Sequence, residues 1–577
     1  MPTLAEVPWN CSGSSLAQRP GIVATIHGQP LWRSDDARIT QAADDSHAVL
    51  AAYELHGESF LRLLHGRFAL AVLDTRQRRA LLAVDRMGVE RLCYALRGPQ
   101  LVFGTSAEAV ARACGAPRLR LQSLLSYLFF HMVPSADTIF EGVRKLPPAA
   151  QLTFRIGAPL TESIYWQPQF VETAPRAADF SELRQELHRA LFTAVAAARP
   201  DEHCGAFLSG GLDSSTVAGY LGKVTGRRAR TFSIGFGLDQ YDELRYARIA
   251  NAHFNCDARE YQAAPADIVA HFAAIAAAYD EPFGNASALP TLCCARLAHD
   301  NGVDHLLAGD GGDELFAGNK RYAEQLIFER YQLVPGWFRR ALLEPLLSAL
   351  PPALRVGVLR KGRNYVAQAN TPLPDRLEIW NFLHRLGFDA VLHPEFAAAV
   401  DASQPLQHMR SAYAASGARS RLNRMLHYDW RLTLADNDLR KVGAMCELGG
   451  VRVSYPMLHP DVVDLSLRVP PRLKMRGMEL RTFYKQAMTD FLPREILLKT
   501  KHGFGLPFGL WLQRSPPLAA LINDNLAGLR SRRIVRAEFI DRLMRLHGED
   551  DASYYGVMIW TLAMLEQWFR EHRLAPS

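Results

Sequence analysis

The chain of 577 residues has no run of about 18 apolar residues, which is the length that a membrane-spanning helix needs. Residues 1–10 also lack the charged segment followed by an apolar one that marks a secretory signal. The first absence excludes a helical membrane protein, and the second argues against export. We therefore expect a cytoplasmic protein with no membrane partner.

Cysteine is scarce and unpatterned, and neither sign of charge is in large excess. The 8 cysteines form no C-x-x-C pair and no zinc-ligand spacing, which favours scattered reduced thiols. The 66 basic and 59 acidic residues leave a net charge of +7, without a long basic run that contains aromatic residues. This balance argues against a nucleic-acid partner. A chain of this length with 48% hydrophobic residues predicts two or more globular domains.

The loop Ser209–Ser215 carries the clearest chemical signal. Its sequence is S-G-G-L-D-S-S, and it lies between the apolar, strand-like Cys204–Leu208 and the helix-like Thr216–Leu221. A strand, a tight loop and a helix start together present backbone N–H groups that bind phosphate. Asp213 would repel that phosphate, so the loop implies Mg²⁺ between the carboxylate and the anion. The alternative is a plain turn between a strand and a helix.

A second loop, Ala308–Glu314, has the sequence A-G-D-G-G-D-E and follows the strand-like Val303–Leu307. Strand-like and helix-like runs alternate between the two loops in β-α-β-α-β order, which is typical of an open, doubly wound parallel sheet. Ligands gather at the carboxyl ends of the strands in such sheets. We therefore expect Asp313 to face Asp213 across a metal-bound pyrophosphate.

Together the two loops resemble the pyrophosphatase-type ATP site of the asparagine synthetase B family, whose members also carry a class II glutamine amidotransferase domain. The resemblance extends to further segments, namely Leu64–Asp74, Asp85–Tyr94, Phe103–Ala109, Leu146–Pro148 and Leu492–Pro507. It implies an α/β fold with an Ntn-hydrolase-like α+β sandwich at residues 1–170. A doubly wound, parallel-sheet ATP domain with a helical C-terminal part would follow at residues 180–577.

The resemblance also implies a reaction, in which ATP adenylates a carboxylate and an amine then displaces AMP. The enzyme would be an AMP-forming carbon–nitrogen ligase. Asp213 and Asp313 would hold Mg²⁺. Lys501 would stabilise the charge on the phosphoryl and acyl groups, and Asp310 would be the base, where the family carries Glu. The predicted ATP contacts are Leu208, Ser209, Gly210, Gly211, Asp213, Ser214, Ser215, Ser233, Ile234 and Gly309.

The N-terminal segment departs from the family pattern. Working members have a cysteine directly after the initiator Met, whereas this chain has Pro2 there and its first cysteine is Cys11. The glutamine-binding loop of the family is reduced to His27–Leu31. We therefore predict that glutaminase activity is lost, unless cleavage of a propeptide exposes Cys11.

Two later segments bear on the substrate. Arg452 and Ser454 stand where asparagine synthetases have the Glu and Arg that fix the charged groups of aspartate, and we expect Asp280–Ala288 to contact the acyl substrate. An inactive glutaminase, an intact ATP site and altered substrate loops resemble the lasso peptide cyclases. That resemblance implies that a peptide carboxylate is activated and that the peptide's own amine closes a macrolactam. A leader-peptide-binding protein and a protease would be partners.

Three alternatives stay open. The chain could be an asparagine synthetase that uses ammonia or glutamine, an amidotransferase for another small-molecule metabolite, or a catalytically inactive scaffold in a biosynthetic complex. A scaffold predicts loss of Asp213, Asp313 or Lys501, and the chain retains all three.

Overall fold

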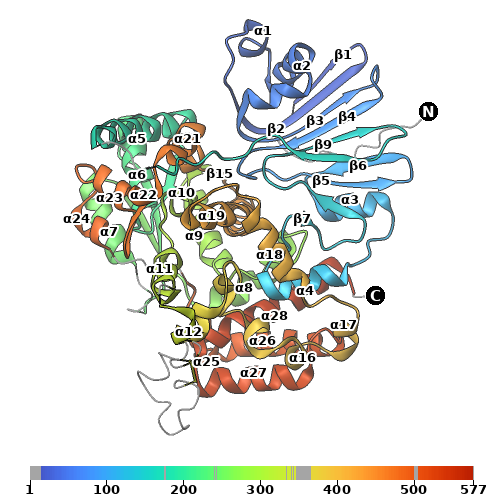
Figure 1. Ribbon diagram of the computed structural model, residues 1–577, viewed down its shortest axis with the longest axis vertical. Coiled ribbons are helices and arrows are strands. Elements are labelled where there is room, and N and C mark those ends of the chain that lie inside the picture. Colours follow the sequence, from blue (N-terminus) through green and yellow to red (C-terminus); the bar gives the residue numbers. More distant parts are fainter. Residues whose placement is uncertain are drawn as a thin grey trace.

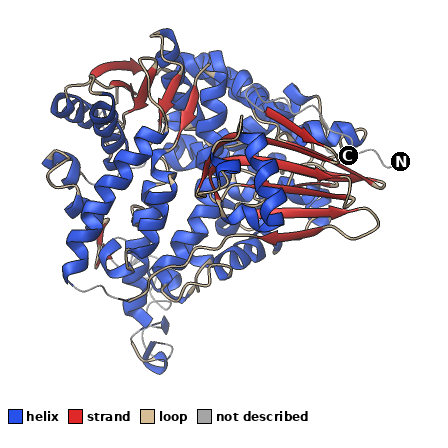
Figure 2. Cartoon of the chain, turned by 90° about the horizontal axis from the view of Figure 1, so that it is seen from above, coloured by secondary structure: helices blue, strands red, loops and turns tan. Residues whose placement is uncertain are grey.

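The computed structural model describes residues 15–173, 177–238, 241, 243–332, 334–339, 341, 344–345, 365–499 and 505–575. Two antiparallel sheets form the N-terminal part, a parallel sheet follows, and the C-terminal part is helical (Figure 1). Figure 2 shows the strands in two groups, one at each side of the molecule, with helices between and around them. This mixed α/β architecture confirms the predicted fold class.

The N-terminal part is a four-layered sandwich of helices and two sheets. The sheets have the strand orders β1-β2-β3-β4-β9-β10 and β6-β5-β8-β7. Helix α2 packs on the first sheet and α3 on the second. The strands are β1 (Ser15–Arg19), β2 (Ile22–Trp32), β3 (Leu64–Asp74), β4 (Arg79–Val84), β5 (Cys93–Arg97), β6 (Gln100–Gly104), β7 (Ala136–Asp137), β8 (Val143–Lys145), β9 (Ala150–Arg155) and β10 (Thr161–Ile164). The helices are α1 (Ala37–Thr40), α2 (Asp45–His56), the 3-10 helix η1 (Gly57–Arg62), α3 (Ala107–Cys114) and α4 (Leu121–Phe130).

The sequence of β3 explains how one strand serves two layers. Successive side chains of a strand point to opposite faces of its sheet. Phe68, Leu70 and Val72 therefore enter the core beneath α2. Ala69 and Ala71, which alternate with them, enter the core between the two sheets. Both faces are apolar, so β3 is buried on both sides.

The parallel sheet has the strand order β13-β12-β11-β14-β15. The chain runs outward from β11 to β13 and then returns to place β14 on the other side of β11, so the order reverses between β11 and β14. Ligands bind at such a switch point in open α/β sheets. The strands are β11 (Cys204–Phe207), β12 (Arg230–Gly235), β13 (Asp257–Gln262), β14 (His305–Leu307) and β15 (Arg452–Ser454). The accompanying helices are α5 (Ala177–Ala197), α6 (Leu212–Thr225), α7 (Leu244–Phe254), α8 (Pro265–Ala278), α9 (Ala288–Asp300) and α10 (Gly312–Phe316).

Helices dominate the rest of the chain, and α28 forms their core with its fully buried Trp560 and Trp568. The first of these helices are α11 (Lys320–Gln332), α12 (Gly336–Phe338), η4 (Asp375–Glu378), α15 (Phe382–Leu386), α16 (Phe388–Val391), α17 (Pro394–Ala398), α18 (Gln404–Ala414), α19 (Arg421–Asp429), the π-helix η5 (Trp430–Asp438) and α20 (Leu439–Leu448). The later ones are η6 (Pro456–Leu458), α21 (Pro460–Arg468), α22 (Pro471–Lys474), α23 (Thr482–Ala487), α24 (Arg494–Leu498), α25 (Phe508–Arg514), α26 (Pro516–Ser531), α27 (Ala537–Glu549) and α28 (Ala552–His572), with a hairpin of β16 (Met475–Arg476) and β17 (Glu479–Leu480). No helix in the described part of the chain is long and apolar enough to cross a bilayer.

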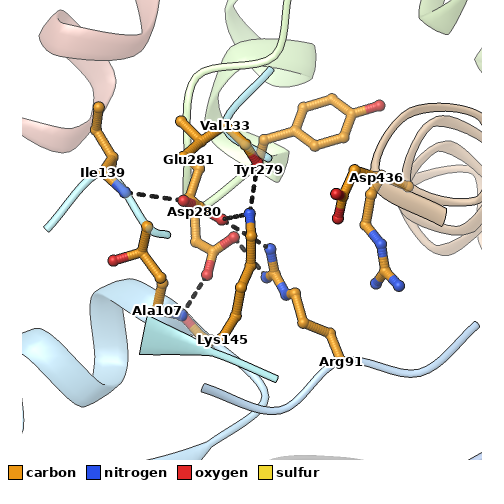
Figure 3. A network of polar contacts seen from close by, with 12 residues as sticks. Arg91, Ala107, Val133, Ile139, Lys145, Tyr279, Asp280, Glu281 and Asp436 are labelled. Carbon is orange, nitrogen blue, oxygen red and sulfur yellow. Dashed lines mark hydrogen bonds and ion pairs between the residues drawn. The ribbon is translucent and has the colours of Figure 1, made fainter. Parts of the chain in front are cut away.

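A buried polar network joins the N-terminal sandwich to the parallel-sheet part (Figure 3). Asp280 accepts a hydrogen bond of 2.5 Å from Arg91 Nη2, and Glu281 accepts one of 2.9 Å from Lys145 Nζ. Backbone N–H groups of the sandwich, those of Ala107 and Ile139, donate to the same two carboxylates. The expectation that Asp280 and Glu281 contact the acyl substrate is therefore wrong, because both carboxylates are used to join the two parts. The division into domains at residues 1–170 and 180–577 stays a prediction.

Lys145 tests how much this junction contributes to stability. Both Lys145 and Glu281 are 7% exposed, and Lys145→Met removes the nearer of two cations from this buried carboxylate, since Arg91 Nη1 lies 3.5 Å away. We expect the free energy of unfolding in urea to fall by about 3–5 kcal/mol. Arg533→Met, which breaks an ion pair with Glu395 whose partners are both 64% exposed, is the control and should cost less than about 1 kcal/mol. Equal losses in the two variants would contradict a stabilising junction.

Candidate functional site

A cavity of about 710 Å³ lies at the carboxyl ends of β11, β12 and β14. Most of the predicted nucleotide and metal residues line it, namely Leu208, Ser209, Gly211, Asp213, Ser214, Ser233, Ile234, Gly309, Asp310 and Asp313. Gly210 and Ser215 are not among its lining residues, and the Ser215 side chain is fully buried. The fold thus brings together two loops that are almost a hundred residues apart in sequence, because β11 and β14 are neighbours in the sheet.

The first loop is held by its own hydroxyl groups. Ser209 Oγ and Ser214 Oγ lie 3.1 Å apart, and the Ser209 N–H donates to Ser214 Oγ at 3.3 Å. Gly210 has a φ of +68°, and a Cβ at this position would lie 2.4 Å from the backbone nitrogen of Ala247. Only glycine fits there, so α7 and the loop approach each other closely. Helix α6 begins at Leu212, within this segment, so Asp213 and Ser214 lie in its first turn and its N-terminal end faces the cavity.

The second loop packs against the first without room for side chains. A Cβ on Gly309 would lie 2.8 Å from the backbone nitrogen of Ser214, and one on Gly312 would lie 2.1 Å from Asp213 Oδ1. These glycines let the Asp213 carboxylate sit between the two loops. The G-D-G-G-D pattern is therefore explained by close backbone approach as well as by its carboxylates.

Arg481 bridges the two carboxylates that the sequence assigns to the metal. Its Nη1 and Nη2 donate to the two oxygens of Asp213, each at 2.5 Å, and Nη1 also lies 3.1 Å from Asp313 Oδ1. The guanidinium is 4% exposed and lies 4.2 Å from the centroid of the Tyr484 ring. Sequence reasoning missed this residue, because 268 residues separate it from Asp213. The only available signal was that two carboxylates in a phosphate cradle need a counter-charge.

Asp213 and Asp313 nevertheless fit Mg²⁺. The ion binds through one or two carboxylates and completes its octahedron with phosphate oxygens and water. Because the Arg481 guanidinium contacts both carboxylates, a single cation at its position can contact both. The described residues contain no cluster of three or more His, Cys, Asp or Glu side chains suited to a metal, so the remaining ligands would come from ATP and water. Mg²⁺ bound here would neutralise the charge of the departing pyrophosphate.

Asp310 lies beside a second charged group, formed by Asp438 and Lys441. Lys441 Nζ donates to Asp438 Oδ1 at 2.7 Å, and all three side chains line the cavity. Burial raises the pKa of Asp310 to about 6, Lys441 opposes this shift, and Asp438 adds to it. Although burial acts to lower the pKa of Lys441, the Asp438 and Asp310 carboxylates raise it. Asp310 therefore titrates close to neutral pH, which suits a general base.

Lys501, the lysine predicted to be catalytic, lies outside the described residues, as does Cys11. Lys499, which directly follows α24, lines the cavity. Its Nζ is 3.1 Å from Glu243 Oε1 and 3.4 Å from the carbonyl oxygen of Gly210, and burial lowers its pKa. The end of α24 therefore lies next to the phosphate-binding loop.

Comparison with known families agrees with this geometry. Residues 186–570 match the family model described as Asparagine synthase, and residues 33–166 match the Glutamine amidotransferase domain. The chain belongs to the asparagine synthase family. It is accordingly an AMP-forming carbon–nitrogen ligase of the asparagine synthetase type, and ATP is the substrate that its family uses.

Individual relatives cover most of the chain at low identity. "Asparagine synthetase [glutamine-hydrolyzing] 1" of Bacillus subtilis is 24% identical over 526 residues, which are 91% of this chain and 80% of that protein. A putative asparagine synthetase from Mycobacterium tuberculosis is 26% identical over 581 residues, which cover 94% of this chain and 83% of that protein. A solved glutamine phosphoribosylpyrophosphate amidotransferase from B. subtilis is 11% identical and covers 51% of this chain and 63% of its own. Its TM-score of 0.18 is too low to carry a structural argument.

Arg481→Met tests whether the guanidinium and Mg²⁺ share one position. Without the guanidinium, Asp213 and Asp313 repel each other and offer an open cation site. We expect millimolar Mg²⁺ to raise the melting temperature of this variant more than that of the wild type, measured by differential scanning fluorimetry without ATP. Arg472→Met, at an exposed position, is the control for loss of one positive charge. An equal response of the wild type and both variants would contradict a shared position.

Asp310→Asn tests the raised pKa of the proposed base. The folded protein holds this proton up to about pH 6, whereas the unfolded chain loses it near 3.8, so ionisation of Asp310 destabilises the fold. The stability of the wild type relative to the variant should therefore fall as pH rises from 3.8 to about 6, and then level off. We expect a total change of about 1–3 kcal/mol in urea unfolding. A pH-independent difference would exclude the shift, and the exposed Asp541→Asn serves as the control.

Proposed function

We propose that the protein joins a carboxylate to an amine in two steps within the 710 Å³ cavity. The observation that carries this proposal is the position of Asp310, Asp438 and Lys441 on the same cavity as the two phosphate-binding loops. The two loops are suited to a triphosphate, Asp310 is suited to act as a base, and Asp438 and Lys441 provide a pair of opposite charges. This arrangement suits a small molecule that is first activated and then attacked.

In the first step, an oxygen of the substrate carboxylate attacks the α-phosphorus of ATP, and the bond to pyrophosphate breaks. The N–H groups at the start of α6 and the side chains of Ser209 and Ser214 would hold the phosphates. In the second step, the amine attacks the acyl carbon, AMP leaves with the bonding electron pair, and Asp310 accepts the proton that the amine loses. Lys501 stays the proposed stabiliser of the charge on the intermediate.

Aspartate is the first candidate for the acyl substrate, and asparagine would be the product. The name of the Bacillus subtilis relative, an asparagine synthetase, supports it. The Asp438–Lys441 pair also supports it, because a carboxylate and an ammonium group 2.7 Å apart can pair with the amine and the carboxylate of an amino acid. In this assignment, Asp438 and Lys441 take over the role of the Glu and Arg that the family carries where this chain has Arg452 and Ser454.

Macrolactam formation in a peptide is the second candidate. It is favoured by the departures of this chain from the family pattern at the glutamine loop and at Arg452 and Ser454. The predicted glutamine loop, His27–Leu31, is an internal part of β2 and pairs with β3 along its whole length. Arg452 lies 3.5 Å from Asp304 and is 57% exposed, and Ser454 lies 2.9 Å from His305 Nε2, so neither lines the cavity.

A leader-peptide-binding protein and a protease would be partners. The free thiols of the described cysteines support the cytoplasm as the compartment.

The deciding experiment follows AMP and pyrophosphate release from ATP and Mg²⁺, with products identified by mass spectrometry. Aspartate with ammonia or glutamine is tested beside peptides that carry an acidic side chain and a free N-terminus. Asparagine would establish the first candidate. A peptide that loses one water with AMP release would establish the second, and an absence of AMP with every substrate would overturn ligase function.

Asp213→Ala tests the phosphate site itself. We expect loss of ATP–pyrophosphate exchange by at least about a hundredfold, because the variant removes a carboxylate that neighbours both loops and the proposed metal. The exposed Asp541→Ala should keep normal exchange. Exchange at the wild-type rate in Asp213→Ala would remove this residue from the mechanism.

A further inference from the structure

A second cavity, of about 310 Å³, is lined in part by the π-helix η5, which also contributes to the ATP cavity. Aromatic rings supply much of its lining, and Glu378 is its only acidic residue among those described. The aromatic residues are Phe129, Phe130, Trp380, Phe382, Tyr428 and Tyr554. A cavity of this size is large enough for a ligand of amino-acid size.

Glu378 stands out because its charge is not balanced nearby. Within the described part of the chain, its carboxylate makes no hydrogen bond and no ion pair. Arg321, the nearest cation that affects it, donates instead to Asp429 and Thr433. Burial raises the pKa of Glu378, with Arg321 opposing the shift. A cation bound in the cavity would therefore offset the cost of ionising this carboxylate.

The aromatic rings around this carboxylate are suited to a cation. The faces of Trp, Tyr and Phe attract ammonium and guanidinium groups. Arg385 shows this locally, because its guanidinium lies 5.0 Å from the centroid of the Tyr554 ring and 5.7 Å from that of Trp380. Arg321 likewise lies 6.0 Å from the centroid of the Tyr428 ring. Neither arginine lines the cavity, and its described lining residues include Glu378 but no lysine or arginine.

The π-helix makes this cavity a neighbour of the reaction site. Leu432, Thr433 and Asn437 line the aromatic cavity, whereas the next residue, Asp438, lines the ATP cavity. π-Helical turns are rare and occur frequently at functional sites. Asn437 also accepts a hydrogen bond of 2.8 Å from Asn285, which ties the wall to the segment before α9. An occupant would therefore contact the segment that carries Asp438.

We propose that the aromatic cavity binds a small organic ammonium ion, with Glu378 as its ion-pair partner and the surrounding rings as its cage. An anion would be repelled by Glu378, and a neutral apolar ligand would leave that carboxylate buried without a partner. A divalent metal ion needs several oxygen ligands, and the cavity offers one carboxylate among aromatic rings. The charge and the rings together select an amine with an apolar body.

Isothermal titration calorimetry with 2-phenylethylammonium chloride tests the proposal on the full-length protein. A non-hydrolysable ATP analogue at saturation fills the ATP cavity and removes its carboxylates as competing sites. We expect the ammonium compound to bind at least about tenfold more tightly than 2-phenylethanol, its neutral counterpart. Glu378→Gln should abolish this preference, and Glu549→Gln, an exposed carboxylate elsewhere, should keep it.

A second variant separates binding from folding. Glu378→Gln removes an unbalanced charge, so its melting temperature should not fall below that of the wild type. Trp380→Leu changes a ring that is 56% exposed, which the fold tolerates, and it should weaken the ammonium compound several-fold while leaving 2-phenylethanol less affected. Equal affinity for the two compounds in the wild type, or a retained preference in Glu378→Gln, would overturn the proposal.

Discussion

The site depends on keeping two carboxylates, Asp213 and Asp313, next to each other in a cradle built for phosphate. Arg481 provides the counter-charge, with both of its terminal nitrogens on Asp213 and one of them also near Asp313. The loops can approach each other because glycine stands at the positions where a side chain would strike Asp213. These features depend on one another, since two neighbouring carboxylates in a partly buried site repel each other unless a cation lies between them.

The parallel sheet provides the frame for this arrangement. Its strand order reverses between β11 and β14, and both phosphate-binding loops leave the sheet at that point. The N-terminal sandwich is joined to the same frame by buried ion pairs from Arg91 and Lys145, which occupy Asp280 and Glu281. A segment expected to select the substrate therefore contributes to the junction between the two parts instead.

The π-helix η5 separates two cavities of different chemistry. One contains the phosphate-binding loops and the charged group of Asp310, Asp438 and Lys441, and the other contains aromatic rings and Glu378. Because Asn437 and Asp438, the last two residues of η5, line different cavities, this helical segment contributes to both. In an asparagine synthase family member, this places a further ligand-sized space beside the carboxylate that neighbours the proposed base.

The sequence by itself determined the local elements. Short-range sequence patterns predict the two glycine-rich loops, the strands that precede them and the alternation of strands and helices. They also led to the expectation that Asp213, Ser214 and Gly309 lie at one site. Tertiary structure alone decided the partners. Arg481, Lys441 and Asp438 belong to segments far along the chain whose local pattern carries no phosphate signal, and Asp280 and Glu281 gave no sign that they pair with Arg91 and Lys145. The physical reason is that backbone geometry is a local property, whereas charge compensation in a buried site is met by whichever residues the fold brings within a few ångströms.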